Sequence, residues 1–161
     1  MDSLLDEIES RLRGRSVVVV GIGNRLRGDD GVGPRVVERV AVAGPELVID
    51  AGTTPENFLG PLIQRAPQVV LFVDAIEFGK APGHFILSPV EDLAGRLSTT
   101  HAPSLQLVAD ILAAYGIECW VLGIQPARTT VGAALHPRVE RAAEEAAEAL
   151  AWVLCREVSR V

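Results

Sequence analysis

A single stretch, Ser16–Gly33, most constrains the fold that this chain can adopt. Its first part, Val17–Val20, is a continuous apolar run without polar alternation, which is typical of a central parallel strand buried on both faces. A glycine-rich segment follows and carries two adjacent acids, Asp29 and Asp30. Open α/β sheets bind their ligands beyond the carboxyl ends of such strands. The stretch therefore predicts a strand, a loop with a ligand site, and the start of a helix.

Further apolar runs and helical patterns follow along the chain. Strands are expected at residues 47–49, 69–73, 84–87 and 118–124, helices at 3–12, 34–42, 54–63, 104–115 and 137–156, and a turn or short helix at 91–97. The run at 84–87 follows its predecessor too closely for a parallel crossover, so we expect an antiparallel or edge strand there. The alternation of elements predicts an α/β fold, a three-layer sandwich with a mostly parallel central sheet of about five strands flanked by helices.

The length of the chain suits a single domain, residues 1–161. Residues 16–156 contain the predicted sheet and most of its helices, and residues 1–14 form an extra helix in front of them. The apolar residues at helical spacing in this extra helix are Leu4, Ile8 and Leu12. Because they share one face, we assign the helix to packing rather than to chemistry.

Composition excludes several classes of protein. The formal net charge of −6 argues against nucleic acid as a partner, and no apolar run approaches the roughly 20 residues that span a bilayer. The acidic N-terminus lacks the features of a signal peptide, so we expect a cytoplasmic protein without membrane insertion. Cys119 and Cys155 form no metal or redox motif, and we interpret them as packing thiols in a reducing compartment.

A glycine-rich loop after a first strand often binds a dinucleotide. Here Gly21 and Gly23 supply the first two glycines of that fingerprint, and Asp50 would suit a ribose-binding acid. However, Leu26 stands where the third glycine belongs, and the two adjacent acids would repel pyrophosphate from the helix N-terminus. Dinucleotide binding is therefore the less favoured interpretation.

A different site is predicted from three residues on three loops. Asp30 follows the first strand, Asp74 ends the third, and His101 precedes the helix at 104–115. Such loops share one edge of a parallel sheet, and two carboxylates with one imidazole suit a divalent transition metal. Structural roles remain open at this point: either acid of the first loop could cap a helix, Asp74 could cap a turn, and His101 could be an ordinary loop histidine.

Five ordered blocks extend this pattern across the chain. They are Gly21–Gly33, Asp50–Asn57, Val73–Ala75, Thr99–Leu105 and Leu122–Pro126. Together they resemble the [NiFe]-hydrogenase maturation endopeptidases, most closely the branch that processes the formate-hydrogenlyase hydrogenase (hydrogenase 3). The resemblance runs from the first strand to the last helix, and the N-terminal helix lies outside it.

The resemblance implies an endopeptidase. Such proteins remove a C-terminal extension from the precursor of a [NiFe]-hydrogenase large subunit after nickel insertion. The metal-binding positions of the family match Asp30, Asp74 and His101. The resemblance thus implies that these residues bind metal and act in catalysis. It also implies the large-subunit precursor as the partner, and we expect a monomer by default.

The nickel ion can be bound by either of two proteins, the substrate or the protease. It can belong to the substrate, which would select loaded precursors, or the protease can hold a metal of its own, and other divalent metals can occupy the same ligands. At the same edge we expect Gly23 and Asn24 to bind substrate, with Gln125 as a further candidate, and Asp29 to cap a helix or support the site. The alternative function is a non-proteolytic nickel-binding maturation chaperone on the same fold.

Overall fold

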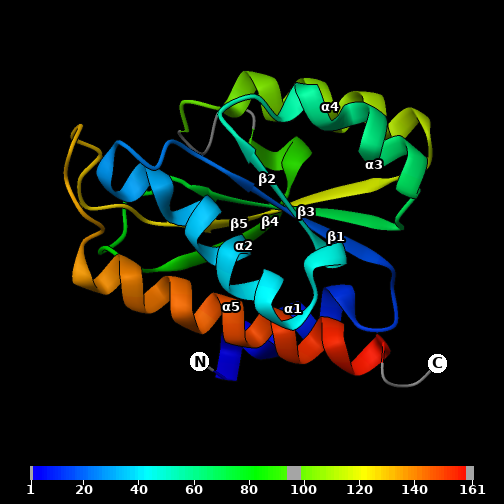
Figure 1. Ribbon diagram of the computed structural model, residues 1–161, viewed down its shortest axis with the longest axis horizontal. Helices are drawn as coiled ribbons and strands as arrows, with labels where there is room; N and C mark the ends of the chain where they lie inside the picture. The colour runs from blue at the N-terminus through cyan, green and yellow to red at the C-terminus, as the bar shows by residue number, and fades with distance from the viewer. Residues whose placement is uncertain (1, 94–98, 159–161) are drawn as a thin grey trace.

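The computed structural model describes residues 2–93 and 99–158 and has the predicted three layers (Figure 1). Its strands are β1 (Val17–Ile22), β2 (Val48–Gly52), β3 (Val69–Ala75), β4 (Phe85–Pro89) and β5 (Glu118–Ile124). Its helices are α1 (Asp2–Leu12), α2 (Val32–Ala43), α3 (Leu59–Arg65), α4 (Ala102–Ala114) and α5 (Pro137–Val158). The fold class expected from the pattern of strands and helices is confirmed.

The strands form one mixed sheet in the order β2-β1-β3-β5-β4. β1 pairs in parallel with β2 and β3, and β3 pairs in parallel with β5. β4 lies at the edge, antiparallel to β5, as the short connection before it predicted. Every residue of β3 is buried, which explains its continuous apolar sequence.

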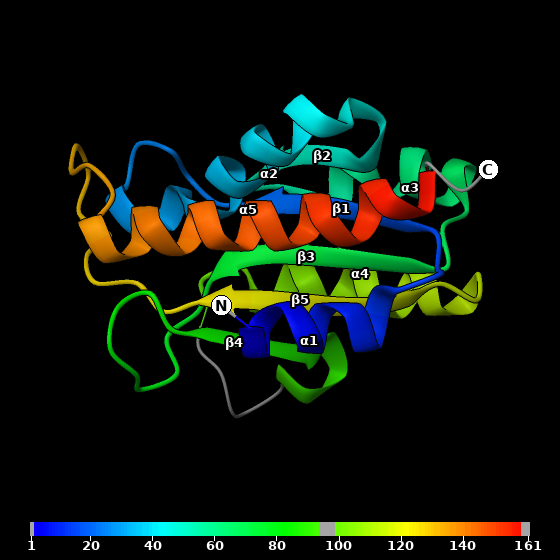
Figure 2. The same cartoon turned by 90° about the horizontal axis from the view of Figure 1, so that it is seen from below.

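Helices cover both faces of the sheet. In Figures 1 and 2, α1, α2 and α5 lie along one face, whereas α3 and α4 lie along the other. Side chains of β1 alternate between the two layers: Val17 and Val19 join the core beneath α2 and α5, and Val18 and Val20 join the core beneath α4. This alternation follows from the two-residue period of a strand.

Helix α1 packs against the core as its apolar face predicted. Leu4, Ile8 and Leu12 are each at most 5% exposed and belong to the same cluster as the buried face of α5. The guanidinium of Arg11 lies 5.1 Å from the centroid of the Trp120 ring on β5.

Within residues 2–93 and 99–158, no helix combines the length and apolar character needed to cross a bilayer.

Two local expectations have different outcomes. A helix was expected to begin at Thr54, but the chain enters a 3-10 turn, Pro55–Phe58, before α3 begins. The side chain of Thr54 makes no cap hydrogen bond among the described residues, because its hydroxyl oxygen instead accepts from Asn57 Nδ2 at 3.1 Å. The helical turn expected at 91–97 is a 3-10 turn at Val90–Leu93, and residues 94–97 lie outside the described ones.

Strand order places a ligand site at one edge. The chain leaves β1 toward β2 on one side and resumes at β3 on the other side of β1, so these two central strands form a topological switch point. Ligands of open α/β sheets bind beyond the carboxyl ends of the strands at such a point. Asp30 lies in the segment that follows β1, and Asp74 lies near the carboxyl end of β3.

Candidate metal centre

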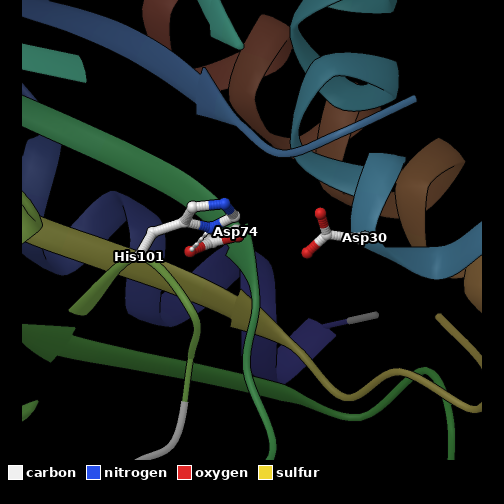
Figure 3. A group of neighbouring side chains, drawn as sticks. All are labelled: Asp30, Asp74 and His101. Atoms are coloured by element: carbon white, nitrogen blue, oxygen red, sulfur yellow. Dashed lines mark hydrogen bonds and ion pairs between the residues drawn. The ribbon is translucent and has the colours of Figure 1, made fainter. Parts of the chain in front are cut away.

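Three side chains meet at this edge. Asp30 lies in a 3-10 turn, Gly28–Gly31, that follows β1, whereas Asp74 lies near the end of β3 and His101 is the N-cap residue of α4. Figure 3 shows their side chains directed toward one another from these separate segments. One ligand atom from each lies within 4.8 Å of the others. The structure thus brings together the three residues singled out in the sequence.

Asp74 and His101 form a buried pair. The carboxylate of Asp74 is fully buried, and His101 Nδ1 lies 3.3 and 3.2 Å from its two oxygens. The hydroxyl of Thr99 donates to Asp74 Oδ2 at 2.7 Å and accepts from the His101 backbone N–H at 3.2 Å. Thr99 therefore orients both residues, and its position two residues before the histidine was the only sign of this in the sequence.

The environment of the pair shifts both protonation equilibria. Burial raises the pKa of the Asp74 carboxyl, and hydrogen bonds from His101 and Thr99 only partly oppose that shift. The hydrogen bond to Asp74 raises the pKa of His101 more than burial lowers it, and the negative charges of Asp74 and Asp30 add to the rise. The pair therefore holds a proton to higher pH than an isolated imidazole would.

Asp30 is oriented from its own loop. Its Oδ2 accepts a hydrogen bond from the backbone N–H of Asn24 at 3.0 Å, and the carboxylate remains only partly buried. The side chain of Asn24 accepts from the N–H of Leu26 at 2.9 Å, which fixes the turn. Asn24 thus positions a candidate ligand, while its expected contact with substrate stays a prediction.

Gly23 permits the close folding of this loop. Its φ of +146° lies in the region that favours glycine, and a Cβ there would stand 1.8 Å from the backbone oxygen of Asp30. The space left by the missing side chain is therefore filled by the protein's own backbone. A substrate contact at Gly23 also stays a prediction.

The carboxylate of Asp29 binds the loop after β5 and does not belong to the cluster of candidate ligands. Asp29 is fully buried, and its carboxylate accepts hydrogen bonds of 2.7–2.8 Å from the backbone N–H groups of Ala127, Arg128 and His136. Of the two roles expected for Asp29, the capping of α2 is not observed, because α2 has no side-chain cap bond among the described residues, and support of the site stays a prediction. Asp29 instead fastens the loop between β5 and α5 to the loop after β1.

Gln125 has a comparable role on the other side of the site. It is 2% exposed, and its Oε1 accepts from the N–H groups of Phe78 and Lys80 at 2.9 and 3.2 Å. Its Nε2 donates to Glu77 Oε2 at 2.7 Å. Gln125 therefore shapes the segment that follows Asp74, and direct contact with a peptide would require breaking these bonds.

Two other residues considered in the sequence, Asp50 and Cys119, take no part in the candidate metal centre. The carboxylate of Asp50, considered for ribose binding, pairs with Arg25 at 2.8 Å. Burial raises the pKa of the Cys119 thiol to about 12, so this cysteine stays protonated and is a poor nucleophile. Neither residue belongs to the cluster of Asp30, Asp74 and His101.

The donor set suits a divalent transition metal. Two carboxylates and one imidazole form a mixed oxygen and nitrogen shell. Ligands held at about 2.0–2.2 Å from one ion lie about 3–3.4 Å apart. The separation of 3.2–3.3 Å between Asp74 and His101 matches that spacing and is also a hydrogen-bond distance, whereas the ligand atoms of all three residues lie within 4.8 Å of one another.

Comparisons with known proteins agree on one family. The family model for hydrogenase maturation proteases matches residues 34–152. The hydrogenase 3 maturation protease of Escherichia coli K12 is 38% identical over 112 residues, which cover 68% of this chain and 72% of that protein. The crystal structure of the [NiFe] hydrogenase maturation protease HycI from Thermococcus kodakarensis superposes with a TM-score of 0.78 at 30% identity, covering 94% and 99% of the two chains.

A second structure agrees. The solution structure of the endopeptidase HycI from Escherichia coli has a TM-score of 0.74 at 32% identity over 83% of this chain and 87% of that one. The feature shared with these solved structures is the α/β sandwich fold. The chain belongs to the hydrogenase maturation protease family.

Proposed function

We propose that this protein is an endopeptidase that removes the C-terminal extension of a [NiFe]-hydrogenase large-subunit precursor after nickel insertion. Its membership of the maturation protease family supports the reaction. The single observation that carries the assignment of the site is the convergence of Asp30, Asp74 and His101 within 4.8 Å at the switch-point edge. No other cluster of this kind occurs among residues 2–93 and 99–158.

The three residues then engage the nickel of the immature substrate. Asp74 is fully buried and His101 is 8% exposed, so these two residues form the buried part of the site. Asp30 is partly buried and forms its more accessible part. A metal held here can polarise a scissile carbonyl, and a second version gives the protease an ion of its own. In either version Asp30 is the accessible carboxylate that can accept a proton from an attacking water.

The decisive experiment is mass spectrometry of nickel-loaded precursor after incubation with the purified protein. The wild type should release the C-terminal extension. Asp30→Ala, Asp74→Ala and His101→Ala should remain folded and leave the precursor intact. Asp110→Ala, which removes an exposed carboxylate on α4, should trim like the wild type.

Each outcome separates two interpretations. Wild-type trimming in all three variants would remove these residues from the reaction. An intact precursor with the wild-type protein would favour the non-proteolytic nickel-binding chaperone. Metal analysis of the isolated protein distinguishes the owner of the nickel, since a substrate-borne ion predicts a purified protease without stoichiometric metal.

The cellular setting is part of the proposal. We infer that the protein acts in the cytoplasm as a monomer that docks transiently onto its precursor. The acidic net charge of −6 and the absence of a membrane-spanning helix within residues 2–93 and 99–158 support this setting. Light scattering of the purified protein tests the oligomeric state, and a stable dimer at working concentration would contradict it.

A further inference from the structure

Two loops beside the metal centre form one continuous surface. The N–H of Gly132 donates to the Leu26 carbonyl at 2.8 Å, and the N–H of Asp29 donates to the Arg128 carbonyl at 2.8 Å. In Figure 1 the two loops, blue and orange, lie side by side at the left edge of the molecule. We call four of their exposed residues the rim: Leu26, Arg27, Arg128 and Val131.

The rim exposes two large apolar side chains. Leu26 and Val131 are each 72% exposed. Single exposed apolar residues are normal on protein surfaces, but these two lie on segments whose backbones are joined by a hydrogen bond. Two exposed apolar side chains therefore lie on neighbouring segments of one surface.

The rim is also positively charged. Arg27 and Arg128 are exposed, and neither forms an ion pair within the described part of the chain, whereas Arg25, Arg35 and Arg39 are all paired with acids. Only the Nε groups of the two rim arginines are engaged, each with a backbone carbonyl at 3.4 Å. The whole chain carries a net charge of −6, so a locally positive surface is unusual on it. Such a positive surface is complementary to acidic groups of a partner.

The rim is held in place from beneath. Asp29 binds three backbone N–H groups of the loop after β5. Gly28 also lies close to that loop, because a Cβ on Gly28 would stand 2.7 Å from the Arg128 carbonyl oxygen. A surface that is already ordered loses little conformational freedom when a partner binds. The same turn carries Asp30, whose N–H donates to the Arg27 carbonyl at 3.1 Å, so the rim is continuous with the metal centre.

We propose that the rim is the docking surface for the precursor polypeptide, and this inference rests on the proposed protease function. An apolar side chain of the precursor packs on Leu26 and Val131. Acidic side chains that flank it pair with Arg27 and Arg128. The rim thereby sets the position of the precursor relative to Asp30.

The apolar half of the rim is tested with the double variant Leu26→Ser/Val131→Ser. The matched control is Val42→Ser, which removes an 89% exposed valine from the far end of α2. Affinity for nickel-loaded precursor is measured by biolayer interferometry, and KM and kcat by the trimming assay. We expect the double variant to weaken the Kd and raise KM about tenfold with kcat unchanged, and the control to match the wild type.

The charged half is tested with Arg27→Ser/Arg128→Ser and with the exposed Arg13→Ser as control. Raising the salt concentration should weaken precursor binding by the wild type and by the control, because salt screens exposed charges. The double variant should bind more weakly at low salt and respond much less to added salt. Circular dichroism and thermal melting verify that every variant is folded.

The possible outcomes divide clearly. Unchanged Kd and KM in both double variants would contradict the proposal that the rim docks the precursor. A loss confined to kcat would contradict it as well. A wild-type dimer that Leu26→Ser/Val131→Ser dissociates, with precursor affinity unchanged, would show that the rim joins copies of this chain instead. A wild type that binds the precursor through the rim without trimming it would defeat the protease function but leave the docking surface standing.

Discussion

Asp29 and Asp30 are neighbours in sequence and have opposite environments. The carboxylate of Asp29 is fully buried and saturated by three backbone N–H groups, whereas that of Asp30 is partly exposed and faces Asp74 and His101. The first acid therefore serves stability and the second is available for chemistry. Consecutive residues in a tight turn point in different directions, which is why one pair of acids supplies both roles.

This division predicts different results from the same substitution. Asp29→Asn places an amide donor against backbone N–H groups and should lower the free energy of unfolding by about 2–3 kcal/mol. Asp30→Asn keeps an acceptor for the N–H of Asn24, so it should cost about 1 kcal/mol or less while abolishing trimming. Urea denaturation and the trimming assay measure the two effects. Equal destabilisation by both substitutions would contradict the assignment.

The buried pair predicts a pH dependence of stability. Because the pKa of His101 is raised in the folded state, its contribution is present below the ordinary value of 6.5 and is lost as pH rises through the raised pKa. The pKa of Asp74 is also raised in the folded state, which again binds the proton more tightly than the unfolded state does. The contribution of Asp74 to stability is therefore also lost as pH rises above its ordinary value of 3.8. Stability should therefore fall as pH rises, above 3.8 through Asp74 and further above 6.5 through His101.

Urea unfolding between about pH 5.5 and 9 measures this dependence. His101→Gln should flatten the decline above about pH 6.5, because it removes the imidazole that retains the proton. The control is His84→Gln, an exposed histidine on the segment before β4, which should keep the wild-type decline. A His101→Gln protein that declines as steeply as the wild type would argue against the hydrogen-bonded pair.

At the scale of elements, the start of α2 lies directly against two strands. A Cβ on Gly33 would stand 2.2 Å from the Val73 carbonyl oxygen and 2.3 Å from that of Ile22. The glycine therefore sets the distance between α2 and the sheet, as a small residue does where a helix must approach backbone closely. Since the turn that carries Asp30 leads directly into α2, the position of the helix also determines that of the candidate ligand.

Gly33→Ala should force α2 away from β1 and β3. We expect a loss of about 3 kcal/mol in the free energy of unfolding, with trimming reduced at temperatures where the protein is still folded. Gly60→Ala is the matched control, because its Cβ would meet nothing within 4 Å in α3. That control should be neutral or stabilise by up to about 1 kcal/mol. Similar losses from both substitutions would show that helix–strand contact is not the cause.

For the whole molecule, the N-terminal helix α1 is a structural addition on the face of the sheet that carries α5. Its apolar residues complete the core there, and the metal centre lies at the carboxyl edge of the strands. The helix should therefore affect stability without affecting the reaction.

Ile8→Ala tests this separation. Ile8 is fully buried, so its truncation should lower the free energy of unfolding by about 2–4 kcal/mol and lower the melting temperature. Trimming by the folded variant should equal that of the wild type, and the exposed Asp6→Ala should change neither quantity. Trimming that falls together with stability, in protein shown to be folded, would indicate that α1 acts on the site.

Much of this architecture could be predicted from the sequence. The apolar runs at 17–20 and 69–73 became central strands, and the run at 84–87 became the antiparallel edge strand, because periodicity and connection length are local properties. The meeting of Asp30, Asp74 and His101 was also predictable, since loops that follow parallel strands share one edge.

The sequence by itself thus determined the layers of the fold and the edge at which the candidate site lies. Only the tertiary structure decided the roles of Asp29 and Gln125, whose side chains bond to groups 45–107 residues away along the chain, apart from one bond of Gln125 to the adjacent Pro126. The tertiary structure also brought Leu26 beside the loop that carries Val131. No local pattern specifies such partners, because a buried polar group takes whichever backbone donor the packed layers bring to it.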